Sequence, residues 1–204
     1  MDVDDLLRLA DVYADNNQLS KALDCCKEAI QKDPKDENSY FMKGQINYLS
    51  KKYLEAIGDF SKAINIYPDE VFYLWRGICK EHLDFDEWAL EDYNDALKLN
   101  PNCATALTNK AALYERQNKW EEALELYIHA IKVKKDWSFI YFQMSKLHLR
   151  LSEYEAAINA IKKAYQLEPL EEYKNLLTII IEKSGSHPIH SFSNFFDGEI
   201  IENN

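Results

Sequence analysis

The chain has 204 residues, a formal net charge of -11, and only five glycines and five prolines. The scarcity of glycine and proline argues against a fold with many strands and tight turns. The acidic net charge disfavours binding to nucleic acid. The first 15 residues lack the basic start and apolar run of a secretory signal, and no run approaches the roughly 20 apolar residues of a membrane helix. We therefore expect a cytoplasmic, mostly helical protein without membrane insertion.

The first predicted elements are two amphipathic helices, at about residues 3–16 and 19–32, joined by a polar turn. Pro34 follows the second helix, where proline cannot continue a helix and so sets the turn. Further prolines stand at Pro68, Pro101 and Pro169, so the gaps are 34, 33 and 68 residues. We call each of these proline positions a repeat mark. Since 68 is twice 34, one mark without a proline falls at Lys135. This spacing predicts five copies of one two-helix unit.

Three columns of residues repeat at fixed distances before these marks. Alanine stands five residues before every mark, at Ala29, Ala63, Ala96, Ala130 and Ala164. It also stands twelve residues before every mark, at Ala22, Ala56, Ala89, Ala123 and Ala157. The position between these columns holds Cys26, Phe60, Tyr93, Tyr127 and Ile161. Small residues let neighbouring helices approach closely, and the larger residue fills the remaining space.

The first helix of each copy has its own pattern. A Leu or Tyr stands at Leu6, Tyr40, Tyr73, Leu107 and Tyr141, and a small residue follows four positions later at Ala10, Gly44, Gly77, Ala111 and Ser145. Over residues 3–169 the chain resembles the tetratricopeptide repeat (TPR) family. Tyr13 and Tyr114 match the family's next position, whereas Asn47, Lys80 and His148 depart from it. The resemblance implies an all-α, right-handed superhelical solenoid of antiparallel helix pairs.

We expect one TPR domain over residues 1–184. Its repeats are predicted at about 3–36, 37–69, 70–103, 104–137 and 138–171, with a further helix at about 170–184. That helix has one apolar stripe, made of Tyr173, Leu176, Leu177, Ile180 and Ile181. A solenoid needs a terminal element to cover its last open face, so we interpret this helix as a cap. The alternative is an oligomer face.

The resemblance places ligand contacts on the concave face, on the first helix of each copy. The predicted peptide-binding groove consists of Phe41, Met42, Gln45, Leu74, Trp75, Ile78, Asn109, Ala112, Arg116, Phe142, Lys146 and Arg150. Its middle is apolar and its C-terminal end is basic, which favours a protein or peptide partner with apolar anchors and an acidic end. The alternative for any one of these residues is packing between neighbouring helices.

Some members of the family clamp the C-terminal carboxylate of chaperones with Lys, Asn and Arg side chains at set positions. Asn109 matches the middle Asn of that clamp. Leu74 and Ile78 stand where a Lys and an Asn are needed, and Phe139 and Gln143 stand where a Lys and an Arg are needed. We therefore expect no chaperone-tail clamp.

The last 20 residues, 185–204, change in character. They combine acidic residues with Phe192, Phe195, Phe196, Ile200 and Ile201. One interpretation is a loose terminus. The other is a docking tail, because five bulky apolar residues are many for a solvated segment.

No pattern in the sequence indicates catalysis, a metal or a cofactor. His187 and His190 have no further histidine or cysteine nearby, and the adjacent Cys25 and Cys26 point in different directions on a helix. A glycine-rich phosphate loop is also missing from the sequence. We predict a scaffold or adaptor protein that is not an enzyme.

Two alternatives stay open. In the first, the protein is a self-assembling homodimer or is self-occluded, with the tail or the last helix filling a groove or dimer face. In the second, it is a co-chaperone-like or secretion-chaperone-like helper.

Overall fold

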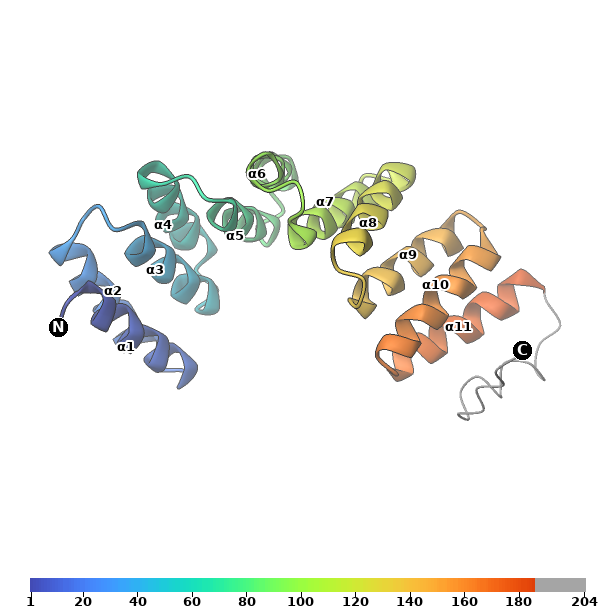
Figure 1. Cartoon of the computed structure of the whole chain (residues 1–204), viewed down its shortest axis with the longest axis horizontal. Coiled ribbons are helices and arrows are strands. Elements are labelled where there is room, and N and C mark those ends of the chain that lie inside the picture. Colours follow the sequence, from blue (N-terminus) through green and yellow to red (C-terminus); the bar gives the residue numbers. More distant parts are fainter. Residues whose placement is uncertain (186–204) are drawn as a thin grey trace. The chain divides into compact units, whose positions relative to one another are not determined.

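The computed structural model describes residues 1–185, which form eleven α-helices joined by short turns (Figure 1). This confirms the predicted all-α class. The helices group into two compact units, Met1–Leu113 and the part of the chain from Tyr114 onward. Each unit is described by itself.

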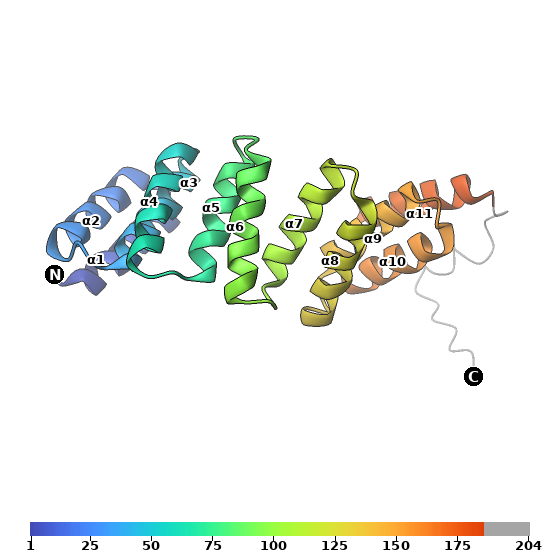
Figure 2. The ribbon, with the colours of Figure 1, turned by 90° about the horizontal axis from the view of Figure 1, so that it is seen from above.

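The first unit holds three antiparallel helix pairs that lie side by side (Figure 2). Its helices are α1 (Val3–Asp15), α2 (Leu19–Lys32), α3 (Glu37–Leu49), α4 (Tyr53–Ile66), α5 (Glu70–Glu81) and α6 (Asp86–Leu99). The second helix of one pair packs on the first helix of the next, and α1, α3 and α5 also contact one another in turn. The division between the units falls within α7 (Ala104–Arg116).

The second unit contains α8 (Trp120–Val133), α9 (Ser138–Arg150), α10 (Tyr154–Leu167) and α11 (Glu171–Ser184). Helices α9 and α10 form a pair, and α11 packs on α10. The predicted apolar stripe of α11 is mostly buried: Tyr173, Leu177, Ile180 and Ile181 pack against α9 and α10.

The turn inside each pair reverses the chain by the same device. One non-glycine residue has a left-handed backbone with φ between 56° and 62°, and it stands 17 positions before each mark: Asn17, Lys51, Asp84, Asn118 and Ser152. Asn and Asp tolerate this conformation best. The first helix of each of the first three copies begins at an aspartate whose carboxylate accepts a backbone N–H bond: Asp2, Asp36 and Asp69.

The repeated columns form the core. All ten alanines are 0% exposed, and so are the five residues between them. Gly44 and Gly77 face the rings of this middle column, since an added Cβ would lie 2.6 Å from Phe60 Cε1 and 2.7 Å from Tyr93 Cε1 respectively. A side chain at Gly44 or Gly77 would therefore require the facing ring to shift.

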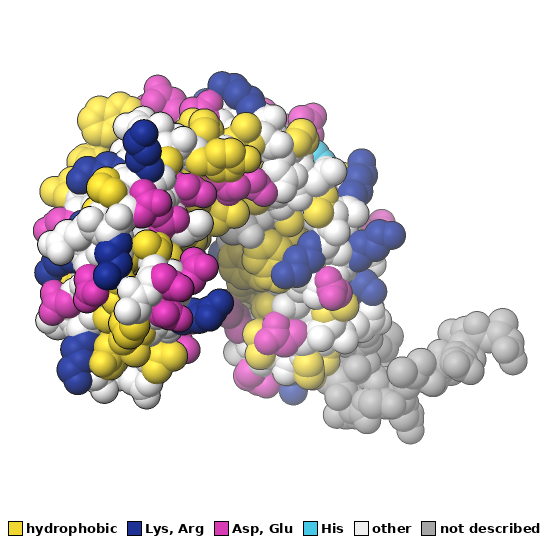
Figure 3. Space-filling model, turned by 60° about the vertical axis from the view of Figure 1, so that its left-hand side comes forward, with side chains coloured by type: hydrophobic (Ala, Val, Ile, Leu, Met, Phe, Trp, Pro, Cys, Tyr) yellow, Lys and Arg dark blue, Asp and Glu magenta, His cyan; other side chains and the backbone are white. Residues whose placement is uncertain are grey.

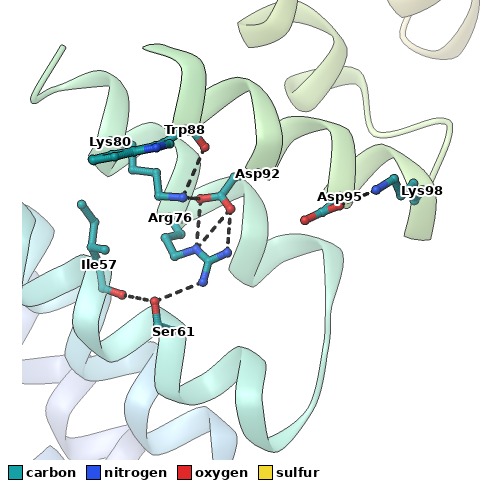
Figure 4. A network of polar contacts seen from close by, with 8 residues as sticks. All are labelled: Ile57, Ser61, Arg76, Lys80, Trp88, Asp92, Asp95 and Lys98. Atoms are coloured by element: carbon teal, nitrogen blue, oxygen red, sulfur yellow. Dashed lines mark hydrogen bonds and ion pairs between the residues drawn. The ribbon is translucent and has the colours of Figure 1, made fainter. Parts of the chain in front are cut away.

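The three departures from the family's tyrosine position are explained by ionic partners in their own copies. Asn47 donates to buried Asp59, which also binds Lys43 at 2.6 Å. Figure 4 shows the same arrangement one copy later, where Lys80 and Arg76 both bind buried Asp92. His148 lies 2.6 Å from Glu153. Polar pairs thus replace the tyrosine in these copies.

Candidate functional site

The apolar part of the predicted groove lies on α3 and α5 in the first unit. Phe41 and Trp75 are both half-buried. The ring of Phe41 is centred 4.8 Å from that of Phe72, and the ring of Trp75 is centred 5.2 Å from that of Tyr48. These side chains therefore combine core packing on their inner edges with accessible surface on their outer edges.

The remaining predicted residues on α3 and α5 are half-buried as well. Met42 packs against the cluster around Ala10, and Leu74 and Ile78 pack against the cluster around Tyr93. Gln45 adds a half-exposed polar side chain. We call Phe41, Met42, Leu74, Trp75 and Ile78 the apolar stripe. On the visible surface of the molecule, hydrophobic side chains lie interspersed with acidic and basic ones (Figure 3).

Asn109 on α7 takes part in a structural hydrogen-bond network. Its side chain bonds to the hydroxyl of Tyr93, which donates to Glu81 Oε2 at 2.8 Å. Burial raises the pKa of the Tyr93 hydroxyl, and the carboxylate of Glu81 raises it further. Asn109 thus helps to hold the Tyr93 side chain of α6 in place. Asn109 and Ala112, on the same helix, are both half-exposed.

In the second unit, the structure corrects the expectation for Phe142. This side chain is only 8% exposed, and its ring is centred 4.9 Å from that of Tyr173 on α11. It belongs to the core because α11 covers it. Lys146 lies over the same ring at 5.2 Å, and Arg116 and Arg150 are exposed. The predicted cations are therefore at the surface of this unit.

One aromatic cluster beside the apolar stripe was not predicted. Tyr48 Oη lies 3.1 Å from His82 Nε2, and the His82 ring stacks on Tyr53 with centroids 4.6 Å apart. Burial raises the pKa of Tyr48. The available signal was the register, because Tyr48 near the end of α3 and His82 directly after α5 stand at adjacent positions of successive copies.

Within residues 1–185 there is no group of three or more potential metal-ligating His, Cys, Asp or Glu side chains, and none of the helices there could cross a membrane. All four cysteines are free, and burial raises the pKa of Cys26 and of Cys79 to about 12. The histidine pair at positions 187 and 190 and the predicted docking tail lie outside the described residues.

Comparison with known families supports the repeat pattern. Models of the tetratricopeptide repeat match residues 3–36, 37–70, 87–132 and 140–169, which together make up most of the chain.

Two curated relatives show what kinds of protein carry similar segments. Anaphase-promoting complex subunit 3 of Schizosaccharomyces pombe is 26% identical over 165 residues, which covers 80% of this chain and 25% of that protein. The Hsp70-Hsp90 organising protein of Plasmodium falciparum is 32% identical over 87 residues, covering 39% of this chain and 15% of that protein. The chain thus spans a quarter or less of the length of these relatives.

Solved structures show the same fold at low identity. The type IV pilus biogenesis factor PilW matches with a TM-score of 0.78 at 16% identity, covering 90% of this chain and 87% of its own. YrrB, described as a TPR protein with an unusual peptide-binding site, matches with a TM-score of 0.68 at 19% identity, covering 85% and 89%.

Proposed function

The chain belongs to the tetratricopeptide repeat family, and from this premise we propose that it is a scaffold or adaptor that binds a peptide segment of a partner protein on the face formed by α3 and α5. The observation that carries the proposal is the apolar stripe. Its five side chains are half-buried, whereas the other core columns are fully buried. Large apolar side chains that stay accessible on one face indicate an interaction surface.

The apolar stripe offers five partly accessible side chains for recognition of a short segment. Burying one large apolar side chain completely stabilises a complex by roughly 1.5–3 kcal/mol, and part of that remains available on each half-buried residue. Trp75 is the best anchor because tryptophan is enriched among residues that dominate binding energy. Its ring is also held by Tyr48 and Phe60, so little conformational freedom is lost on binding.

A partner that also contacts the second unit is proposed to carry an acidic end in addition to its apolar anchors. The second unit has Arg116, Lys146 and Arg150 on its surface, in a protein with a net charge of -11. These cations favour a partner with acidic residues, because opposite charges across an interface attract. YrrB, which shares the fold, has a peptide-binding site by its own description.

Within the scaffold class, a general adaptor is favoured over a chaperone-tail clamp. The similarity to an Hsp70-Hsp90 organising protein covers only 39% of this chain. Asn109, the one residue that matches the clamp, is bonded to Tyr93. Leu74 and Ile78, at positions where the clamp needs polar donors, pack on the cluster around Tyr93. The proposal therefore includes neither the clamp nor catalysis. As expected from the sequence, we also propose that the protein is cytoplasmic.

Helix α11 is proposed to cap the array. At the register of Tyr141 and His148, which face the second helix of their own copy, α11 carries Asn175 and Glu182. Both are exposed. A polar outer face is what a terminal element of a solenoid requires.

The test is a pull-down with wild-type protein and two tryptophan variants. Trp75→Leu shortens the half-buried anchor, and Trp88→Leu makes the same change at a site on α6 that is 55% exposed. We expect Trp75→Leu to reduce partner recovery about tenfold or more, and Trp88→Leu to leave it unchanged. Equal recovery with folded Trp75→Leu, as judged by circular dichroism, contradicts the proposed face.

A further inference from the structure

A cleft of about 410 Å³ lies in the first unit between α2 and the pair α3–α4. Its ionisable lining residues are Lys27, Lys43, Lys52, Lys62, Glu55 and Asp59. Four lysines and two carboxylates give a local formal charge of +2, although the whole chain has a charge of -11. The cleft is lined from α2, α3 and α4, and none of its lining residues belongs to the apolar stripe.

Gly58 of α4 lines the cleft without a side chain. Gly58 is exposed, and a Cβ added there would meet no atom within 4 Å. Both oxygens of buried Asp59 are already engaged, one by Lys43 Nζ at 2.6 Å and the other by Asn47 Nδ2 at 2.8 Å. The negative charge deepest in the cleft is therefore compensated from within the protein.

Two of the other lysines, Lys27 and Lys62, make weak contacts with their neighbours. Lys27 pairs with Asp24 at 2.9 Å, but both side chains are more than half exposed, and such pairs stabilise a fold by at most about 1 kcal/mol. Lys62 Nζ lies over the ring of Tyr40 at 5.5 Å. An incoming anion can recruit these ammonium groups without breaking a buried interaction.

The next copy of the repeat shows that this cleft is not a general property of the fold. At the positions equivalent to Lys27, Lys52, Glu55, Gly58 and Lys62, the next copy has Ser61, Phe85, Trp88, Glu91 and Asp95. Figure 4 shows the result: Ser61 accepts a bond from Arg76 at 3.1 Å, and Lys80 donates to the backbone carbonyl of Trp88. At four of these positions, a lysine or glycine of the cleft corresponds to a neutral or acidic residue in the next copy.

We propose that the cleft binds a phosphoryl group, supplied by a phosphorylated side chain of a partner protein or by a free phosphate ester. A phosphoryl group carries about -1.5 to -2 charges at pH 7, opposite in sign to the net charge of the cleft-lining side chains. Lysine ammonium groups bind phosphate as point charges and do not require the planar geometry of arginine. Because the cleft-lining residues are not those of the apolar stripe, this site can act whether or not a peptide binds on α3 and α5.

The test is an NMR titration of the ¹⁵N-labelled chain at constant ionic strength, with sodium chloride as the balancing salt. The probes are inorganic phosphate, a short peptide with one phosphoserine, and the same peptide with serine. We expect saturable shifts of the Gly58 and Lys62 amides with the first two probes and none with the third. Tighter binding of the phosphopeptide assigns the site to a partner's side chain, and equal binding assigns it to a free ester.

Three variants locate the site. Gly58→Glu introduces the residue that the next copy has at Glu91, and Lys62→Ser removes one ammonium group from an exposed position. We expect each to weaken phosphate binding roughly tenfold, because a unit charge about 6 Å away at intermediate effective dielectric contributes an interaction of that order. Asn94→Glu adds the same charge as Gly58→Glu, but at an exposed position on α6, and should leave phosphate binding within about twofold of wild type. The proposal is overturned if phosphate gives no saturable shifts, or if both cleft variants bind as well as wild type.

Discussion

Two aspartates decide how individual residues depart from the repeat pattern. Asp59 and Asp92 stand nine positions before their marks, are 3% and 1% exposed, and each binds two donors from the first helix of its own copy. A buried carboxylate is stable only while such partners remain, because an uncompensated buried charge is costly. The non-tyrosine residues Asn47 and Lys80 follow from this requirement.

We expect Asp92→Ala to lower the free energy of unfolding by about 3–5 kcal/mol, since it leaves Arg76 and Lys80 without their shared carboxylate. Asp95→Ala on the same helix is the matched control. Its ion pair with Lys98 is exposed and screened by solvent, so its loss should cost far less than the loss of Asp92. Urea denaturation measures both. Equal losses in the two variants would show that the buried network does not stabilise the unit.

The buried thiols give a second prediction for single residues. Burial raises the pKa of Cys26 and Cys79 from 9.0 to about 12, so the reactive thiolate is depleted roughly a thousandfold at pH 8. Alkylation by iodoacetamide should be correspondingly slow in the native chain and should become normal in urea. Peptide mass spectrometry resolves each cysteine. Rapid native labelling of Cys79 would contradict its place in the core.

At the scale of helices, the close approach of two elements depends on glycine at particular positions. Gly44 and Gly58 lie on α3 and α4 of the same copy, but an added Cβ would be 2.6 Å from Phe60 at the first and would meet nothing at the second. The same residue type therefore has opposite roles. One glycine allows the helices to pack, and the other leaves a surface open.

We expect Gly44→Ala to destabilise the chain by about 1–3 kcal/mol through overpacking against Phe60. Gly58→Ala should instead stabilise it by up to about 1 kcal/mol, because alanine is the better helix former where no atom is displaced. The two changes are compared by urea denaturation. A shift of the same sign in both would contradict the packing described for α3 and α4.

The sequence was sufficient for the helices and the alanine columns, because both depend on local periodicity that recurs in every copy. It was not sufficient for Phe142 and Asn109. Whether a residue of the first helix is exposed depends on its neighbour, and Tyr173 of α11 covers Phe142 while Tyr93 of α6 engages Asn109. The charge of the cleft beside Gly58 was missed because its lysines come from three helices.

For the whole molecule, stability in a repeat array arises mainly between nearest neighbours. The chain divides into two compact units. In the first unit each of α1 to α6 contacts the next helix along the chain, and in the second unit α8, α9, α10 and α11 do the same. A local defect is therefore expected to loosen its own unit before the other.

Phe60→Ala tests this expectation, because Phe60 is fully buried between α3 and α5. We expect the amides of α3, α4 and α5 to lose hydrogen-exchange protection by several kcal/mol, while α9–α11 keep theirs within about 0.5 kcal/mol. Exchange detected by NMR reports both regions in one sample. Equal loss throughout would show that the chain unfolds as a single cooperative unit.

The central claim is that a partner binds on the face formed by α3 and α5. Site-specific photo-crosslinking tests it most directly, with a photoreactive residue at half-exposed Gln45 on α3 or, as the control, at exposed Glu91 on α6. We predict efficient crosslinking of the partner from position 45 and little from position 91. Crosslinking from position 91 but not from position 45 would contradict the account.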